Sequence, residues 1–242
     1  TLIQKALREA VGQGSVFLAE DTIARVDKDI FLKIEQIQLY SQDTLLQKAL
    51  QGSNQIFDGL KDTGNYINKL DAEWTSFAED VVSPFMQEII GNDISDGFRR
   101  GFIGFGERKY GLAVYGEAFV TNKYGVNIAQ TGKTSDYFQA DENWWQEAMQ
   151  NGFSVGELEY DESAAAWTMP LGVRVDDERG NFAGVIKAIP LAREIVRGAE
   201  LATKKYQTTE VKLLTEEGRL VYSTKTFRVF EDLSQKDFFK KI

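Results

Sequence analysis

The sequence predicts an α+β protein in which a long N-terminal helix precedes an antiparallel sheet. In the first part of the chain, apolar residues recur in the steps of three and four that mark one face of a helix: Ile23, Val26, Ile30, Ile34 and Ile37. From Leu112 onward the period changes to two, as in strands with one buried face. The 242 residues are 43% hydrophobic, enough to bury a substantial core.

The helical pattern predicts one helix over residues 19–51, about 50 Å long at about 1.5 Å per residue, which ends at the GSN of residues 52–54. It could be a dimerising stalk or the spine of the fold, and both roles can hold at different ends. A second helix is expected over residues 55–77 and a third after Pro84. The glycines of FRRGFIGFGERKYG are not spaced as a phosphate loop, so we expect turns there.

Two hairpins are expected in the second half of the chain. Residues 117–121 and 126–130 flank a turn in which Gly125 can supply positive φ. Residues 167–175 alternate apolar and polar side chains, and the polar turn DDERGN leads into a second long strand at 182–189. Between the hairpins, Asp141 is the expected N-cap of a helix that runs through Gln150 and ends at Asn151-Gly152.

A helix over residues 191–206 should follow, and after it the chain partly repeats itself. EAFVTNKYGVNIAQTGKT at 117–134 is echoed by EVKLLTEEGRLVYSTKT at 210–226, a weak internal repeat. Because few residues remain after the second copy, that module looks incomplete. The expected organisation is an N-terminal helical region at 1–78, a sheet module at 79–190, and a linker helix with a partial second module at 191–242.

Composition excludes several kinds of function. With 28 basic and 37 acidic residues the net charge is −9, which disfavours nucleic acid as a partner. The chain has no histidine and no cysteine, so a catalytic triad, a thiolate nucleophile and the usual zinc sites are excluded. Adjacent acids such as Asp141 and Glu142 do not establish the separation that glycoside chemistry needs. We expect no catalytic residue, no metal and no cofactor, and no membrane-spanning segment within the chain.

The segments FVTNKYGVNIAQTGKTSDYFQADENWW, VGELEYDESAAAW and GNFAGVIKAI resemble the double Cache family of extracytoplasmic sensor domains of bacterial and archaeal histidine kinases, chemoreceptors and cyclic-dinucleotide enzymes. The resemblance is close over residues 112–189, and the long first helix is similar in arrangement. It implies a membrane-distal module with a PAS-like antiparallel sheet and a second, truncated or small membrane-proximal α/β module. It also implies a small-molecule site between the distal sheet and the helices on one of its faces.

The resemblance also implies candidate ligand-binding residues. Amino-acid binders of the family carry a tyrosine, an arginine two residues before a tryptophan, an aromatic after it, and two later aspartates. The matching residues here are Tyr137, Trp144, Trp145 and Asp161, while Glu142 stands at the arginine position and Ala188 at that of the second aspartate.

An acid in place of the arginine would repel a carboxylate, so the sequence argues against an ordinary amino acid as ligand. The remaining aromatics and acids are closer to a cage for a cation, which predicts an amine or quaternary ammonium ligand. Lys187 could instead serve an anion, but strand alternation points it to the face opposite Ala188.

Structural roles compete with ligand contact at each of these positions. Trp145, Ala148 and Met149 have the i, i+3, i+4 spacing of a core-facing helix stripe. Because adjacent helix residues diverge by about 100°, Trp144 and Trp145 cannot face one way, and at least one should be core. Asp161 could equally be a turn residue or cap, and the helix dipole favours an acid such as Glu142 in a first turn.

The sequence therefore predicts the ligand-sensing domain of a transmembrane receptor, a sensor histidine kinase or a chemoreceptor. Its expected partners are a small-molecule ligand and a second copy bound through the long helix. Membrane anchors would lie outside this chain, which would be periplasmic or extracellular. The alternative is a ligand-free module for dimerisation or protein interaction.

Overall fold

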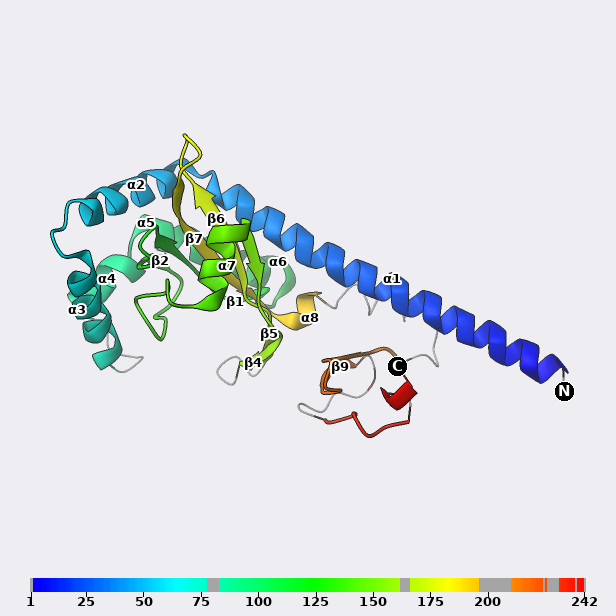
Figure 1. Ribbon diagram of the computed structural model, residues 1–242. Helices are drawn as coiled ribbons and strands as arrows, with labels where there is room; N and C mark the ends of the chain where they lie inside the picture. Colours follow the sequence, from blue (N-terminus) through cyan, green and yellow to red (C-terminus); the bar gives the residue numbers. More distant parts are fainter. Residues whose placement is uncertain are drawn as a thin grey trace. The chain divides into compact units, whose positions relative to one another are not determined.

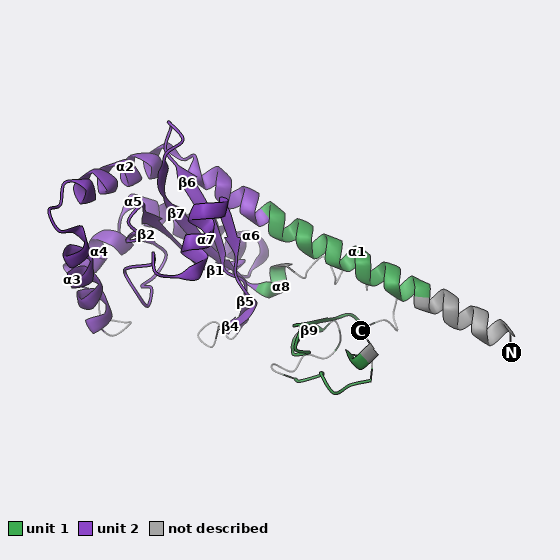
Figure 2. Cartoon of the chain, viewed as in Figure 1, with its two compact units in different colours: residues 1–32, 192–242 green, residues 33–191 purple. Residues whose placement is uncertain are grey.

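The computed structural model describes residues 2–77, 83–161, 166–195, 210–223, 225, 231–237 and 239–241. The chain forms two compact units, residues 33–191 and residues 1–32 with 192–242 (Figure 2). The larger unit holds a five-stranded antiparallel sheet and most of the helices, so the predicted α+β class is confirmed. The three predicted segments, 1–78, 79–190 and 191–242, stay a prediction.

The N-terminal helical region contains two helices where one was predicted at 19–51. Helix α1 spans Leu2–Ser41 and helix α2 spans Thr44–Asp58. The break occurs because the Asp43 carboxylate accepts hydrogen bonds from the backbone N–H groups of Leu45 and Leu46, which starts a new helix there. The GSN segment does not end a helix but lies inside α2.

The next helices begin at side-chain caps as well. Helix α3 spans Thr63–Ser76 behind the N-cap Asp62, so the helix predicted at 55–77 starts later than expected. Helix α4 spans Pro84–Ile90, with the Ser83 hydroxyl as its cap and Pro84 in its first turn.

The glycine-rich segment is helical as far as Tyr110, so the turns predicted at Gly101, Gly104 and Gly106 are wrong, whereas Gly111, with φ of 71°, ends the helix. Helix α5 (Asp93–Phe98), a π-helix (Arg99–Ile103) and helix α6 (Gly104–Tyr110) follow one another without a loop. Two of the glycines permit close packing rather than bends. A Cβ atom at Gly106 would lie 2.8 Å from Cγ2 of Val114, and one at Gly101 would overlap the side chain of Tyr40.

The main sheet has the strand order β2-β1-β7-β6-β3, and all neighbours are antiparallel (Figure 1). The strands are β1 (Tyr115–Asn122), β2 (Asn127–Gln130), β3 (Phe153–Val155), β6 (Leu171–Asp176) and β7 (Phe182–Pro190). Both predicted hairpins, β1–β2 and β6–β7, are therefore confirmed. Gly125 has φ of 80° in the first turn, as expected.

The strand predicted at 167–175 is divided in two. Its first part, β5 (Ala166–Thr168), pairs with β4 (Glu159–Asp161) in a separate two-stranded sheet, and β6 starts after Pro170. Proline has no N–H to donate to a ladder, which explains the interruption at this residue.

Strand pairing divides the main sheet into two faces. Phe119, Lys187 and Gly172 are directly paired across β1, β7 and β6, so they share one face. Helix α7 (Asn143–Asn151) covers this side, and we call it the α7 face (Figure 1). Ala118, Ala188 and Leu171 form the neighbouring row, so they belong to the opposite face.

The opposite face and the edge of the sheet are closed by the N-terminal helices. From α2, Leu50 packs against Gly184, and Asn54 Nδ2 donates to the Ala183 carbonyl at 2.9 Å. At the edge strand β2, Ser95 Oγ accepts from Gln130 N, and Asn92 Nδ2 donates to the Ile128 carbonyl. Pairing these outward backbone groups protects β2 from adding a foreign strand.

The smaller unit contains the second hairpin of the predicted repeat. Strands β8 (Lys212–Leu214) and β9 (Leu220–Ser223) pair around Gly218, whose φ of 86° parallels that of Gly125. Helix α8 spans Ala192–Ile195, and the remainder of the helix predicted at 191–206 lies outside the described residues. Across the described helices, none is both long and apolar enough to cross a bilayer.

Candidate functional site

Helix α7 brings the two adjacent tryptophans to the sheet. It begins at Asn143, with Glu142 as the N-cap residue, so the prediction of Asp141 as the cap is wrong. The Glu142 side chain makes no capping hydrogen bond. The helix ends at Gly152 with φ of 91°, the predicted C-cap position.

Trp145 is a core residue, the structural role that its helical spacing offered as the alternative to ligand contact. It is 4% exposed and packs with Ala148 and Val185, and its ring meets Phe182 edge-on. Its indole Nε1–H donates to Thr121 Oγ1 at 2.8 Å, which satisfies the polar atom of the ring. Trp145 therefore anchors α7 to the α7 face.

Trp144 is half-buried and lies over a different part of the same face. Its ring packs edge-on against Phe119, with centroids 5.8 Å apart. A Cβ atom at Gly172 would lie 3.2 Å from Trp144 Cε3, so glycine leaves room for the indole there. The two tryptophans thus diverge, as predicted, and Trp144 is the one whose ring remains partly accessible.

The cation over the Trp144 ring is Lys187. Its Nζ lies 4.4 Å from the Trp144 ring centroid and 5.5 Å from that of Phe119, within cation–π range. Within the described part of the chain, this ammonium makes no hydrogen bond or ion pair. Burial lowers the pKa of Lys187, and the carboxylates of Glu117, Glu142 and Glu159 partly oppose that effect.

A cavity of about 650 Å³ opens beside Lys187, within the usual size range of small-molecule sites. Its apolar lining comes from Ile103, Phe119 and Ile189. Its polar lining comes from Arg99, Glu117, Thr131, Lys133, Thr134, Ser135, Gln139 and Lys187. The cavity therefore combines an apolar surface with positively and negatively charged side chains.

The other two cations of the cavity are engaged with the protein. Lys133 Nζ donates to the Phe77 carbonyl at 2.7 Å. Arg99 Nη2 pairs with Asp96, and its Nη1 makes longer contacts with the carbonyls of Gln130 and Thr131, at 3.4 and 3.3 Å. Lys187 is therefore the cation best placed to take a new partner in this cavity.

The cavity loop after β2 is anchored to α3. Asp71 Oδ1 accepts hydrogen bonds from the backbone N–H groups of Tyr137 and Phe138, at 2.9 and 3.1 Å. The Trp74 indole donates to the Thr134 carbonyl at 2.8 Å. These contacts hold in place the loop that supplies Thr134, Ser135 and Gln139 to the cavity.

The predicted ligand-binding residues are not gathered into one cage. Tyr137 is buried with Trp74 and Phe85 in a separate cluster, and burial raises the pKa of its hydroxyl far above the ordinary value. Glu142 is exposed. The backbone of Asp161 lies in β4, but its side chain is outside what the structure describes. Which of the five predicted residues touch a ligand stays a prediction.

Lys187 and Ala188 lie on opposite faces of the sheet, as strand alternation predicted, and Ala188 is fully buried in the row of the opposite face. Lys187 shares the α7 face with Trp144. Sequence reasoning missed Phe119 and Arg99. The pairing of β1 with β7 puts Phe119 beside Lys187, but the register of that pairing could not be predicted from the sequence.

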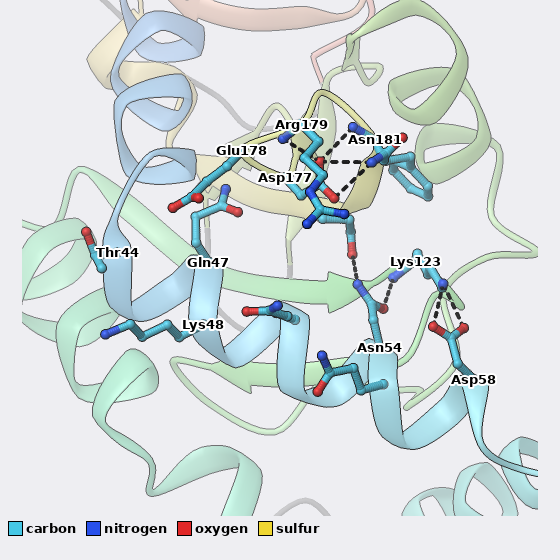
Figure 3. A pocket seen from close by; sticks show the side chains of 14 residues that line it. Thr44, Gln47, Lys48, Asn54, Asp58, Lys123, Asp177, Glu178, Arg179 and Asn181 are labelled. Atoms are coloured by element: carbon cyan, nitrogen blue, oxygen red, sulfur yellow. Dashed lines mark hydrogen bonds and ion pairs between the residues drawn. The ribbon is translucent and has the colours of Figure 1, made fainter.

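A second cavity, of about 720 Å³, lies between α2 and the β6–β7 turn (Figure 3). Its central polar groups are bonded to one another. Asn54 joins the Ala183 carbonyl to Lys123 N, and Lys123 Nζ pairs with Asp58 (Figure 3). These contacts hold α2 to the sheet, so we place the candidate site at the cavity beside Lys187.

The smaller unit has a cavity of about 840 Å³ between α1 and β8–β9, lined mostly by apolar side chains such as Leu18, Val26 and Leu213. Its charged lining residues are Glu210, Lys212 and Glu216, and Lys212 is already paired with Glu210. Across the described residues, no group of three or more acidic side chains could hold a metal ion.

No protein-family model matches the sequence, and a search of curated proteins finds no match. Solved structures with a similar course of the chain include the V. cholerae histidine kinase DctB sensor domain (12% identity, TM-score 0.44, covering 88% of this chain and 69% of that one). Another is the ligand-binding domain of the Pseudomonas aeruginosa PAO1 amino acid chemoreceptor PctC in complex with GABA (12%, 0.42, 72% and 81%). A third is the sensory domain of a Campylobacter jejuni chemoreceptor (12%, 0.40, 80% and 74%).

Proposed function

We propose that this chain is the extracytoplasmic ligand-sensing domain of a transmembrane signalling receptor, and that the cavity beside Lys187 binds a small molecule with a carboxylate group. The observation that carries the ligand class is the position of the Lys187 ammonium, over the rings of Trp144 and Phe119 at the edge of the cavity. The residues that resemble the Cache family, from Phe119 to Trp145, form much of this site.

The physical case for an anionic ligand rests on desolvation. Lys187 has lost part of its hydration, as its lowered pKa reflects, and within the described residues it has gained two aromatic faces and the attraction of the Glu117, Glu142 and Glu159 carboxylates, but no hydrogen bond. A cation–π contact compensates only part of that loss. A carboxylate in the cavity would compensate for the remaining loss of hydration, because it would accept a charge-assisted hydrogen bond from Lys187. Amino-acid binders of the family carry this positive charge on an arginine at the position of Glu142, the N-cap of α7. Here the positive charge is that of Lys187 in β7.

The same geometry weighs against the amine or quaternary ammonium ligand expected from the sequence. Such a ligand would have to displace Lys187 from Trp144 or occupy the cavity beside a like charge. An amino group on a carboxylate ligand is still compatible with the site, because Glu117 lines the same cavity. The proposal therefore includes amino acids and simple carboxylates.

Other parts of the chain support the receptor assignment. Helix α1 runs unbroken from Leu2 to Ser41 and carries exposed apolar side chains, among them Phe17 and Phe31. We propose that this helix mediates a homodimer and leads toward a membrane anchor outside the chain. No catalytic step forms part of the proposal.

A thermal-shift and calorimetry screen tests the ligand class. The panel contains monocarboxylates, dicarboxylates and amino acids, with choline and tetramethylammonium as the cationic arm. We expect one or more carboxylates to raise Tm, and Lys187→Met to weaken binding of the best one by at least about tenfold.

Lys69→Met is the matched control, because Lys69 is exposed on α3 and its loss changes the net charge equally. It should leave binding unchanged. Stabilisation by the cationic arm alone, undiminished in Lys187→Met, would overturn the proposed ligand class in favour of a cation.

A further inference from the structure

The π-helix Arg99–Ile103 contacts both the candidate cavity and α1. Arg99 and Ile103, at its two ends, line the cavity. Between them, Phe102 is buried against Tyr40 of α1, with ring centroids 4.5 Å apart. One five-residue turn therefore joins the wall of the candidate site to the N-terminal helix.

Tyr40 approaches this turn so closely at Gly101 that a larger residue there would displace its side chain. A Cβ atom at Gly101 would overlap Tyr40 Oη and lie 3.0 Å from Cζ. A second contact to α1 runs through Tyr115. Phe102 packs edge-on against the Tyr115 ring, and the Tyr115 hydroxyl donates a hydrogen bond to Gln36 Oε1 of α1 at 3.1 Å. The approach of α1 to the π-helix is thus close and shape-dependent.

A π-helix is suited to switching between two arrangements. It holds one residue more per turn than an α-helix, and its geometry is less favourable, so it persists where surrounding contacts hold it. Moving the extra residue along the helix would rotate the side chains it passes by about 100°. Such a movement would withdraw Phe102 from Tyr40 or press Gly101 more firmly against it.

An anion in the cavity could bias that arrangement through Arg99. The contacts of Arg99 Nη1 with the carbonyls of Gln130 and Thr131 are long, at 3.4 and 3.3 Å, and can be exchanged for a charged partner. A ligand changes a conformational equilibrium only by binding the two states unequally. A ligand that contacts Arg99, the first residue of the π-helix, would bind the two arrangements of that helix with different affinities.

We propose that the π-helix is the coupling element of this sensor: occupation of the cavity changes the packing of Phe102 and Gly101 against Tyr40, and so the seating of α1. The inference rests on the proposed sensing role of the same cavity, but its test does not need the natural ligand. Because the chain has no cysteine, a single introduced thiol can carry an occupant covalently.

In the experiment, Ser135→Cys places a thiol on the cavity lining, and 2-sulfonatoethyl methanethiosulfonate attaches a sulfonate to it as a mixed disulfide. The protein is labelled with 3-fluorotyrosine, and the Tyr40 resonance is identified by its loss in Tyr40→Phe. Ser76→Cys, with the same reagent on the exposed end of α3, is the matched control.

We expect the sulfonate at residue 135 to shift or split the Tyr40 resonance, and the sulfonate at residue 76 to leave it unchanged. In a Gly101→Ala background, Tyr40 should already be displaced and should respond less. An unchanged Tyr40 resonance with the cavity label in place would overturn the proposal, as would an equal response in Gly101→Ala.

If Gly101→Ala does not fold, Phe102→Leu serves the same purpose, because it removes the ring between the cavity wall and Tyr40. The response should again fall. A failed carboxylate screen together with a positive Tyr40 response would reject the proposed ligand class but keep the coupling. The reverse result would reject the coupling alone.

Discussion

The ammonium of Lys187 lies 4.4 Å from the centroid of the Trp144 ring, so the cation that faces this tryptophan belongs to the chain itself. The sequence had directed attention to the acid at residue 142, where amino-acid binders of the Cache family carry an arginine. In the structure, the charge nearest Trp144 comes from Lys187 of strand β7 and not from Glu142 at the start of α7.

Carboxylate binding should weaken with rising pH earlier than an ordinary lysine would allow. Binding requires the charged form of Lys187, and burial lowers its pKa, so the charge is lost at lower pH. Calorimetry with the best carboxylate of the screen, at several pH values between about 7 and 10, would measure this. Affinity that stays constant over that range would contradict the lowered pKa.

The same pKa predicts how stability without ligand depends on pH. Between the lowered pKa of Lys187 in the folded protein and the ordinary lysine value, the unfolded chain binds more protons, so stability rises with pH in this window. The free energy of unfolding of the wild type, minus that of Lys187→Met, should therefore increase as pH rises toward about 10. A flat or falling difference in urea titrations would be inconsistent with a desolvated Lys187.

The two tryptophans should separate stability from binding. Trp145→Phe removes buried surface and the donor to Thr121, and we expect it to lower the free energy of unfolding by about 1–3 kcal/mol. Trp144→Leu should cost less stability but reduce carboxylate affinity, because it removes the ring beneath Lys187. Urea unfolding and calorimetry on both variants measure the two effects. The opposite pattern would mean that the roles of the tryptophans are reversed.

Asp71 should be needed to hold the cavity loop. Asp71→Ala leaves the backbone N–H groups of Tyr137 and Phe138 without their acceptor, which should cost about 1–3 kcal/mol of stability. Asp71→Asn keeps an oxygen acceptor and should recover much of the loss. Glu73→Ala, two residues along the same helix, is the control for removing an acid. Equal losses in Asp71→Ala and Glu73→Ala would show that the loop is held by other contacts.

Two glycines of the same helical segment should respond in opposite ways to alanine. Gly97 has no neighbouring atom within 4 Å of an added Cβ, so Gly97→Ala should stabilise by up to about 1 kcal/mol through helix propensity. Gly101→Ala should instead destabilise by about 1–3 kcal/mol, because the methyl group meets Tyr40. In a Tyr40→Phe background, the cost of Gly101→Ala should shrink. Additive effects of these two substitutions would exclude a direct contact.

Much of the fold could be predicted because the signals are local. Alternation and turn residues identified the β1–β2 and β6–β7 hairpins, and helical spacing predicted that at least one of the two tryptophans is core, which Trp145 is. The break at Asp43 was missed because the apolar spacing continues through Leu45 and Leu46 on the far side of it. The glycine-rich segment was misinterpreted because Gly101 and Gly106 serve contacts with residues elsewhere in the chain, which spacing does not reveal.

The amino-acid sequence alone was sufficient to identify an α+β chain with no histidine or cysteine chemistry, two β-hairpins and at least one tryptophan in the core. It did not determine which face of the sheet carries the candidate site. Alternation shows which residues of one strand point to the same face of the sheet. It does not show which residues of the neighbouring strand point to that face, because this depends on how the two strands pair. The pairing of Phe119 with Lys187, and the passage of α7 over that row, depend on contacts between segments far apart in the chain. Those contacts turned a lysine that the sequence argument had set aside into the central charge of the site.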